Sequence, residues 1–373
     1  MLRIVIPTRA TWRLIDTGLR PAAENIAINR AMLEAHQQGQ IPHTLRFLRF
    51  TPSALVGFHQ SVEQELRTDY CAAHGIAIQR RITGGGAIYF DETQIGWELY
   101  LDRKTLGTAD MQEISRRICE LAAAGIRRLG VEAHFRPRND IEVHGRKISG
   151  TGGAFEGDSI MYQGTLLIDF DIEKMMRVLR IPAEKLSDKA IASARERVAN
   201  LKDLLGAVPE RETVMAALTQ SFAEGFSVDF ERVSGMSAEE QNKFQQALAE
   251  IDHSDWIHLV NRPLSDAPLI EGVHKAEGGL LRVALALDLS TGRIKQAWFT
   301  GDFFVNPRRI IADLEAALRE SPLDRVRRTV DAFFHDHPAE MLRLRPADFA
   351  HAIETAVASM TGNPLSIAGA ERP

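Results

Sequence analysis

The chain of 373 residues contains only two cysteines, Cys71 and Cys119, and this scarcity excludes whole classes of protein. Two thiols cannot build a disulfide framework or a cysteine-rich metal site. The sequence also has no excess of positive charge, because 50 aspartates and glutamates outnumber its 45 lysines and arginines. Proteins that bind nucleic acid normally carry a clustered basic face. The composition therefore argues against nucleic acid as a partner, but it allows a local pocket for a small phosphate ligand.

The sequence also lacks any apolar stretch long enough to form a transmembrane helix. The start of the chain, residues 1–7, has too short an apolar run for a signal peptide, and charge follows at once. No internal repeat and no low-complexity block interrupts the chain. We therefore expect a cytoplasmic protein with no membrane partner, and we expect it to be a monomer.

Length and pattern together predict two domains. A chain of 373 residues is too long for one ordinary domain, and 45% apolar residues are enough to build a core. Strands and helices follow one another in mixed order, which favours an α+β fold over a regular doubly wound sheet. A polar break at 252–268, with Pro263 and Pro268, separates a predicted larger domain (1–255) from a smaller α/β domain (265–373).

Apolar periodicity predicts the main helices and two hairpins. The predicted helices cover residues 21–35, 65–74, 111–129, 197–205, 212–223, 238–251, 307–318, 323–334 and 346–360. The predicted hairpins cover residues 140–148 and 280–299, with tight turns at residues 144–145 and 290–292.

Three consecutive glycines, Gly84 to Gly86, lie between two predicted strands. Glycine tolerates positive φ and leaves the backbone unshielded, so a phosphate can lie directly against the amides. Arg80 and Arg81 come just before the turn and add positive charge with bidentate donors. A glycine-rich hairpin with surface arginines is the simpler alternative, because short motifs are often accidental. The segment is neither a Walker A loop nor a dinucleotide fingerprint, since a strand follows where those motifs need a helix.

Asn139 and Asp140 open a second polar segment, which continues to Gly150. Their side chains can read a base edge or hold a metal ion through oxygen. Lys147 alternates with Ile148 on a short predicted strand, so we expect it to point away from the core. An ammonium group in such a place can neutralise a phosphate as a point charge. An exposed hairpin lysine is the commoner fate of such a residue.

A third segment, residues 160–170, is apolar at both parities, as is typical of a strand buried on both faces. It contains Gly164 and Thr165. A glycine in a strand leaves room for the close approach of a ligand or of another backbone. A core strand with an incidental glycine is the alternative interpretation.

Taken in this order, the three segments resemble the motifs of the lipoate-protein ligase A family in the biotin/lipoate ligase superfamily. That family shows Arg-Arg-x-x-Gly-Gly-Gly-Ala-Val, then Asn-Asp leading to Lys-Ile-Ser-Gly, then Gly-Thr-Leu-Leu. All three motifs stand here in near-complete form, and the similarity extends over residues 20–205. The tail from residue 265 is similar in pattern to the accessory domain of the two-domain bacterial ligases. Weaker matches flank the motifs at residues 24–28, 52–60 and 195–201.

The resemblance implies a biotin/lipoate-ligase-like catalytic domain with a mixed β-sheet and flanking helices, plus the accessory domain. It implies that ATP and Mg²⁺ activate lipoate to lipoyl-AMP, and that the lipoyl group passes to a lysine of a carrier protein. Lys147 would be catalytic, touching the α-phosphate and the lipoyl carboxylate, and Asp140 is the candidate metal ligand. The residues implied to bind the nucleotide or the acyl-adenylate are Arg81, Gly85, Gly86, Ala87, Ile88, Tyr89, Asn139, Asp140, Lys147, Gly164 and Thr165.

The sequence also departs from the family at three places. Residues 90–94 keep only the aspartate of the frequent His-Asp-x-Gly-Asn, Gln163 stands where histidine is common, and residues 151–153 replace Ser-Ala. These changes leave the nucleotide motifs intact but leave the acyl chain, lipoate or octanoate, open. The carrier also stays open among a glycine-cleavage H-like protein, a 2-oxoacid dehydrogenase E2-like domain and a dedicated lipoate-binding protein.

Adenylation needs no protein nucleophile, so Arg81, Lys147 and the glycine amides suit it, and Mg²⁺ would offset the charge of the leaving pyrophosphate. An ATP-independent octanoyl or lipoyl acyltransferase of the same fold is the first alternative. Such enzymes use a cysteine thiolate or a lysine to handle the acyl group, and the cysteine expected close to Lys147 is missing. Cys71 and Cys119 fall on predicted helices, where a cysteine is usually a small apolar residue. A biotin ligase would show a Gly-Arg-Gly-Arg-type segment, which is missing. A non-catalytic protein that holds a lipoyl-adenylate or a lipoyl domain remains a further alternative.

Overall fold

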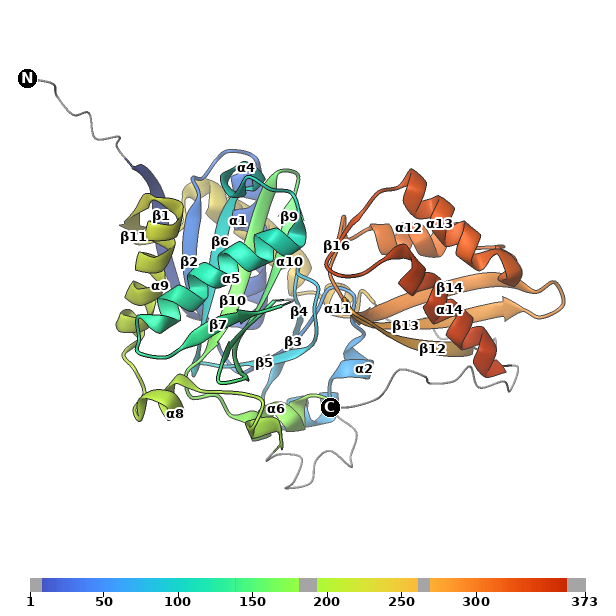
Figure 1. Cartoon of the computed structure of the whole chain (residues 1–373), viewed down its shortest axis with the longest axis horizontal. Coiled ribbons are helices and arrows are strands. Elements are labelled where there is room, and N and C mark those ends of the chain that lie inside the picture. Colours follow the sequence, from blue (N-terminus) through green and yellow to red (C-terminus); the bar gives the residue numbers. More distant parts are fainter. Residues whose placement is uncertain (1–8, 138, 181–192, 261–268, 361–373) are drawn as a thin grey trace, which may run out of the picture. The chain divides into compact units, whose positions relative to one another are not determined.

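A computed structural model describes most of the chain, and the described residues are 9–137, 139–180, 193–260 and 269–360 (Figure 1). The start of the chain and the prolines of the polar break, Pro263 and Pro268, lie outside them. The chain forms two compact units. The first unit comprises Met1–Leu55, Leu66–Ile82 and Ile88–Ile257. The second unit comprises Val56–Glu65, Thr83–Ala87 and His258–Pro373, so the glycine segment belongs to the unit built mainly by the C-terminal part.

An eight-stranded mixed sheet forms the centre of the first unit, as expected for the predicted α+β class. The strand order is β11-β1-β2-β6-β10-β9-β8-β7, in which β1 runs parallel to β2 and β11 while the other neighbours are antiparallel. The strands are β1 (Ala10–Arg20), β2 (Thr44–Phe50), β6 (Gln94–Asp102), β7 (Ala133–Arg136), β8 (Asp140–Val143), β9 (Arg146–Glu156), β10 (Ser159–Leu167) and β11 (Val228–Val233).

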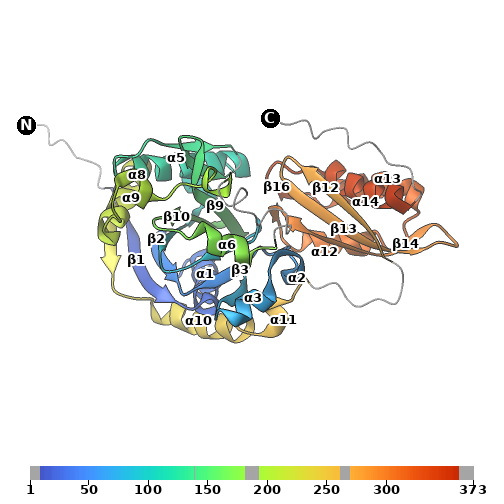
Figure 2. The same ribbon diagram turned by 90° about the horizontal axis from the view of Figure 1, so that it is seen from below.

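Helices cover both faces of this sheet (Figure 2). α5 (Met111–Arg127) and α9 (Arg211–Phe226) pack on one face, and α1 (Ala22–Gln37) and α10 (Ala238–Ile251) pack on the other. Each face therefore has its own hydrophobic core. In α5 the buried residues recur every three or four positions and form one apolar stripe. The Asp110 side chain accepts hydrogen bonds from amides of the first turn, which explains where α5 begins.

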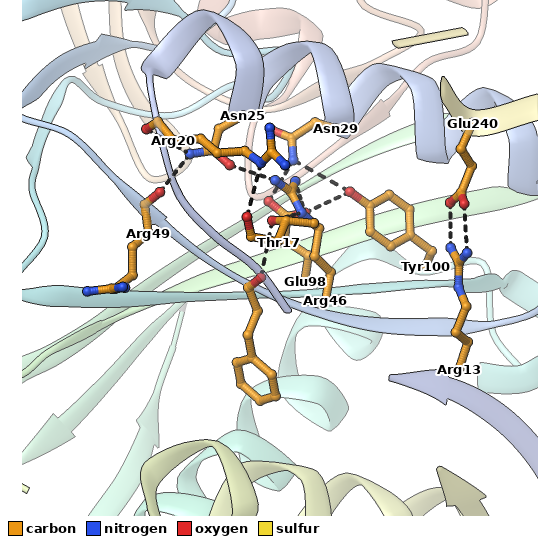
Figure 3. A network of polar contacts seen from close by, with 11 residues as sticks. Arg13, Thr17, Arg20, Asn25, Asn29, Arg46, Arg49, Glu98, Tyr100 and Glu240 are labelled. Atoms are coloured by element: carbon orange, nitrogen blue, oxygen red, sulfur yellow. Dashed lines mark hydrogen bonds and ion pairs between the residues drawn. The ribbon is translucent and has the colours of Figure 1, made fainter. Parts of the chain in front are cut away.

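A network of buried polar side chains lies between α1 and the sheet (Figure 3). Arg46 and Glu98 form a buried ion pair with an Nη1–Oε2 distance of 2.9 Å. Asn29 and Tyr100 donate hydrogen bonds to the Glu98 carboxylate, and Arg46 donates to the Asn25 side chain. A buried ion pair is tolerated when further hydrogen bonds satisfy both partners. These contacts therefore fix α1 on the sheet.

The predicted helix at residues 65–74 was wrong as a single helix. α2 (Val62–Glu65) and α3 (Thr68–Ala73) replace it. Between them Leu66 forms a β-bridge with Leu179, and the pairing with a distant segment outweighs the local helical pattern. α2 belongs to the second unit and α3 to the first. The other short helices of the first unit are α4 (Arg103–Leu106), α6 (Ile172–Val178) and α11 (Ser254–Ile257). A small sheet in the order β4-β3-β5 is formed by the strands β3 (Ser53–Val56), β4 (Ala77–Arg80) and β5 (Ile88–Phe90).

The predicted helix at 197–205 is also shorter in the structure. Only Leu201–Leu205 is helical, and it forms α8. The residue that precedes this stretch by three positions, Val198, instead bridges in parallel to Lys147 on β9. The chain there follows the strand that carries Lys147.

The second unit has an antiparallel three-stranded sheet, β12-β13-β14, with helices packed against it. The predicted hairpin at 280–299 is confirmed as β13 and β14, and the three C-terminal helices are confirmed with small shifts at their ends. Across the described residues no helix is long and apolar enough to cross a membrane. The elements are β12 (Leu269–Ala276), β13 (Gly279–Asp288), β14 (Arg293–Asp302), β15 (Val305–Asn306), α12 (Ile310–Ala317), η2 (Leu323–Arg325), α13 (Val326–Asp336), β16 (Glu340–Met341) and α14 (Pro346–Met360).

Candidate active site

Lys147 lies at the start of β9, directly after the tight turn that joins β8 to β9. His144 and Gly145 in this turn have positive φ angles of 50° and 74°, as a two-residue hairpin turn requires. The strand alternation is confirmed, because Ile148 is fully buried and the Lys147 side chain is 40% exposed. The Lys147 ammonium forms an ion pair with Asp140 on β8, at 2.6 Å from Oδ1.

Residues 197–199 bind the backbone of Lys147 through two hydrogen bonds. The Lys147 amide donates to the Arg197 carbonyl, and the Ala199 amide donates to the Lys147 carbonyl, both at 2.8 Å. These two bonds form the bridge to Val198. The sequence match at 195–201 therefore corresponds to a segment that lies beside the candidate catalytic lysine.

Gly150 lies under the Lys147 side chain and gives it room. A Cβ atom at Gly150 would lie 2.8 Å from Lys147 Nζ. The Thr165 hydroxyl on β10 lies 3.3 Å from the Gly150 amide nitrogen and 3.4 Å from its carbonyl oxygen. The structure thus brings Asp140, Lys147 and Thr165 together around Gly150. Our sequence-based list of site residues missed Gly150, although its fixed spacing after the lysine was the available signal.

Asn139 is tied to Thr151 on β9 by three hydrogen bonds. The Thr151 amide and hydroxyl both donate to the Asn139 carbonyl, at 2.9 and 2.8 Å. The side-chain amide of Asn139 donates in turn to the Thr151 carbonyl. The side-chain amide nitrogen of Asn139 therefore already donates to a backbone carbonyl of the protein.

The space beside Gly164 is filled by a side chain of the protein. A Cβ atom at Gly164 would lie 2.3 Å from Cζ2 and 2.7 Å from Nε1 of Trp97 on β6. The close approach predicted for a ligand or a backbone is therefore made by this indole, and Gly164 serves core packing. The Trp97 side chain is fully buried, and its Nε1 has no hydrogen-bond partner among the described residues.

The two arginines before the glycines have different surroundings. Arg80 is fully buried, and its guanidinium donates to the carbonyls of Trp256 and Ile257 at the end of α11. Carbonyls at the end of a helix are natural partners of a cation. Arg81 is also buried and donates from Nη1 to the Leu55 carbonyl at 3.0 Å.

Tyr89 lies on β5, next to Ile88, and its side chain is buried. Its ring centre is 6.3 Å from that of Phe170, and Lys174 Nζ on α6 lies 5.4 Å from the Tyr89 centroid. Burial, with a smaller effect of the Asp91 charge, raises the pKa of Tyr89 above its ordinary value. The phenol therefore stays protonated at neutral pH.

The glycine segment packs on other residues of its own unit, the second. Gly85 has a φ of +92°, and its amide donates to the Phe303 carbonyl at 3.2 Å. A Cβ atom at Gly84 would lie 2.3 Å from that carbonyl oxygen, and one at Gly85 would lie 2.8 Å from Phe304 Cζ. The same segment contains Gly86 and Ala87. These glycines allow two stretches of backbone to approach closely. From the sequence alone, the space beside them could have held either a ligand or the protein itself.

The surroundings of Asp140 do not fit a metal ion held by the protein alone, because both of its carboxylate oxygens already pair with cations. Asp140 Oδ1 pairs with Lys147, and Oδ2 pairs with Arg136 at 3.0 Å. In the part of the chain that the structure describes, no group of three or more His, Cys, Asp and Glu side chains could hold a metal ion.

Both cysteines are buried and unsuited to nucleophilic chemistry. Cys71 on α3 and Cys119 on α5 are fully buried free thiols. Burial raises the pKa of each above its ordinary value. Cys119 Sγ lies 3.3 Å from the Thr151 hydroxyl and 3.4 Å from the Tyr162 hydroxyl. A reactive thiol needs a lowered pKa and access to solvent, and neither cysteine has them.

Comparisons with known proteins place these features in a family. The model of the lipoyl protein ligase A/B catalytic domain matches residues 21–223, which is more than half of the chain. The octanoyltransferase LipM of Kyrpidia tusciae is 30% identical over 270 residues, covering 66% of this chain and 98% of that protein. The lipoate–protein ligase 1 of Staphylococcus aureus is 28% identical over 267 residues, covering 72% of this chain and 77% of that protein.

Solved structures extend the likeness to the fold. An archaeal bipartite lipoate protein ligase of Thermoplasma acidophilum, described with its E2 lipoyl domain, has a TM-score of 0.62 and 26% identity and covers 69% of this chain and 100% of that chain. A lipoate-protein ligase A bound with ATP has a TM-score of 0.59 and 25% identity and covers 67% and 99%. LipL1 of P. falciparum in complex with lipoate shares the fold over 94% of this chain and 99% of its own, with a TM-score of 0.69 and 17% identity. The protein is therefore an enzyme of the lipoate ligase and transferase group, and it belongs to the lipoyl protein ligase A/B family.

Proposed function

We propose that this enzyme is an ATP-dependent lipoate-protein ligase that makes lipoyl-AMP and passes the lipoyl group to a lysine of a carrier protein. The observation that carries the proposal is the Lys147 ammonium, which Asp140 holds at 2.6 Å beside Gly150 and Thr165. A positioned cation of this kind suits the stabilisation of charge on a phosphate. The chain offers no accessible thiol that could carry an acyl group instead.

The first step requires two anions to meet. A carboxylate oxygen of lipoate attacks the α-phosphorus of ATP, the bond from that phosphorus to the bridging oxygen breaks, and pyrophosphate leaves with the electron pair. Lys147 would offset the charge that gathers on the α-phosphate and on the attacking carboxylate. Arg81 is the further group that we propose for the nucleotide.

In the second step a carrier lysine, as the free amine, attacks the carbonyl carbon of the mixed anhydride. The new C–N bond forms, the C–O bond breaks, AMP leaves with the electron pair, and the amine gives up a proton to solvent. Likeness to a ligase bound with ATP supports the nucleotide, and likeness to a ligase described with its E2 lipoyl domain supports a lipoyl-domain carrier. We propose the cytoplasm, where ATP and such carriers are present, as the place of the reaction.

An octanoyltransferase is the second candidate, and a specific observation favours it. The LipM relative is covered over 98% of its length, whereas the ligase relative is covered over 77%. The departures at Phe90 and Gln163, where the ligase motifs often have histidine, also leave the acyl chain open. Against this candidate stands the burial of Cys71 and Cys119, because transfer through a thioester needs an accessible thiolate.

Mass spectrometry of candidate carriers separates the two functions. Carriers are incubated with enzyme and lipoate, with and without ATP and Mg²⁺, and in parallel with an octanoyl thioester alone. We expect one lipoyl group to be added only when ATP is present, together with lipoate-dependent ATP–pyrophosphate exchange. Octanoyl transfer from the thioester without ATP, and no exchange, would overturn the ligase assignment.

A further inference from the structure

We infer that Thr151 is a positioning residue of this site, whose hydroxyl holds Asn139 and Asp140 in the place from which Asp140 orients Lys147. The inference rests on the proposed function and deepens it. Thr151 stands in one of the stretches where the sequence departs from its family. A further positioning role is therefore assigned to a residue that the motifs do not include.

The Thr151 hydroxyl belongs to a buried cluster of four side chains. Tyr162 on β10 lies at its centre, with its hydroxyl 2.8 Å from Thr151 Oγ1 and 2.7 Å from the Ser115 hydroxyl on α5. The thiol of Cys119 lies on the same side, 3.4 Å from the Tyr162 hydroxyl. The cluster thus joins two central strands of the sheet to the helix that covers them.

The hydrogen bonds of this cluster run in one direction. The Thr151 hydroxyl donates its only proton to the Asn139 carbonyl, so it can only accept from the Tyr162 hydroxyl. Tyr162 therefore donates to Thr151 and accepts from Ser115. Burial raises the pKa of Tyr162, so its phenol keeps its proton and remains a donor at neutral pH. The chain of donors ends at one backbone carbonyl, that of Asn139.

That carbonyl lies one residue before the carboxylate that orients Lys147. Asp140 faces Gly150 across the β8–β9 ladder, and Gly150 is the residue before Thr151. The Thr151 hydrogen bonds therefore fix Asn139 at the point where β8 begins. A shift of that point would move the Asp140 carboxylate, and with it the ammonium that lies over Gly150. A displacement of about 1 Å in a catalytic group is enough to cost rate.

The test compares Thr151→Val with Thr151→Ser. Valine has nearly the shape of threonine but no hydroxyl, whereas serine keeps the hydroxyl and loses only a methyl group. We measure kcat/KM for ATP in lipoate-dependent ATP–pyrophosphate exchange, the Kd for ATP by calorimetry, and Tm. We expect kcat/KM to fall about tenfold in Thr151→Val, as one lost hydrogen bond would give, and to stay within about twofold of the wild type in Thr151→Ser.

Tyr162→Phe provides a second variant in case the valine protein does not fold. It keeps the Thr151 side chain and removes the donor behind it, and we expect a smaller loss, about threefold. A role in stability alone would lower Tm while leaving kcat/KM and Kd for ATP at wild-type values. That pattern, or equal kcat/KM in the valine and serine variants, would overturn the inference.

Failure of the proposed function gives a different result. If the wild-type protein shows no exchange but transfers octanoate from a thioester, the ligase assignment is wrong. The same variants are then compared in the rate of that transfer, where Thr151 is expected to act through Asp140 and Lys147 in the same way. Equal transfer rates for Thr151→Val and Thr151→Ser would overturn the positioning role there also.

Discussion

The ammonium of Lys147 is held 2.6 Å from a carboxylate oxygen of Asp140, on the neighbouring strand of the same hairpin. Both side chains remain partly exposed, so the pair is screened by water and contributes little to stability. Its value lies in orientation, because Asp140 keeps a long, flexible lysine in one place over Gly150. A cation that is already positioned needs less reorganisation when charge develops on a phosphate.

Removal of this ammonium should abolish most of the first step. We predict that Lys147→Ala lowers lipoate-dependent ATP–pyrophosphate exchange by about 10²–10³, the loss typical of one preorganised charge stabiliser. Lys202 is a matched control, because it is similarly exposed and pairs with Asp169 at 2.9 Å. Lys202→Ala should keep wild-type exchange. Near-normal exchange in Lys147→Ala would remove the lysine from the chemistry.

The burial of the thiols predicts how they react. Native protein at pH 8 should resist a thiol reagent such as a disulfide dye, and both Cys71 and Cys119 should react once the chain is unfolded. Cys71→Ala and Cys119→Ala should each keep carrier modification within about threefold of wild type. Fast labelling of a native thiol by an octanoyl thioester, lost in one of these variants, would instead identify a transferase nucleophile.

The packing of Gly164 against Trp97 predicts a stability defect. Gly164→Ala places a methyl group where the indole lies, so either the ring or the strand must move, at a cost of about 1–3 kcal/mol. Gly235 is the control, because a Cβ atom there meets nothing within 4 Å and its φ is not positive. We expect Tm to fall clearly for Gly164→Ala and to change little for Gly235→Ala. Equal Tm values would show that Trp97 does not need this space.

The sequence predicted those features of the site that depend on local order. The alternation of Lys147 and Ile148, and the turn at His144-Gly145, are properties of neighbouring residues, and the structure confirms both. The pairing of the lysine with Asp140 was not predicted, because a register shift between Ile141 and Glu142 sets Asp140 opposite Gly150 rather than opposite Lys147. The turn fixes the register only next to itself, where Val143 faces Arg146 and Glu142 faces Lys147.

The occupants of the space around glycines and arginines could not be predicted in the same way. Gly164 indicates only that room exists, and Trp97, 67 positions earlier in the numbering, fills it. Arg80 and Arg81 are adjacent, yet Arg80 binds carbonyls of α11, a helix that local patterns cannot bring to it. Gly85 likewise donates its amide to the carbonyl of Phe303, a residue far from it in the sequence. These contacts depend on tertiary packing between segments distant in sequence.

Glu315 gives the second unit a predictable dependence on pH. It lies on α12, where burial raises its pKa from 4.5 to about 7, although the Phe299 amide donates to its carboxylate at 2.6 Å. The folded state therefore binds this proton more tightly than the unfolded state. The stabilisation is complete below the unfolded pKa, near 4.5, and is lost as pH rises towards 7. A shift of this size corresponds to a loss of up to about 3 kcal/mol.

Glu315→Gln removes the charge and should abolish this loss. We expect calorimetry to give the variant a higher Tm than the wild type at pH 8 and a nearly equal Tm at pH 4.5. Glu320→Gln is the control, because that side chain is 58% exposed and pairs with Lys295 at the surface. Its Tm should show no comparable gain at pH 8. A wild-type Tm that does not fall between pH 4.5 and 8 relative to Glu315→Gln would mean that the carboxylate is solvated in the folded unit, and that Phe299 and the solvent together offset its burial.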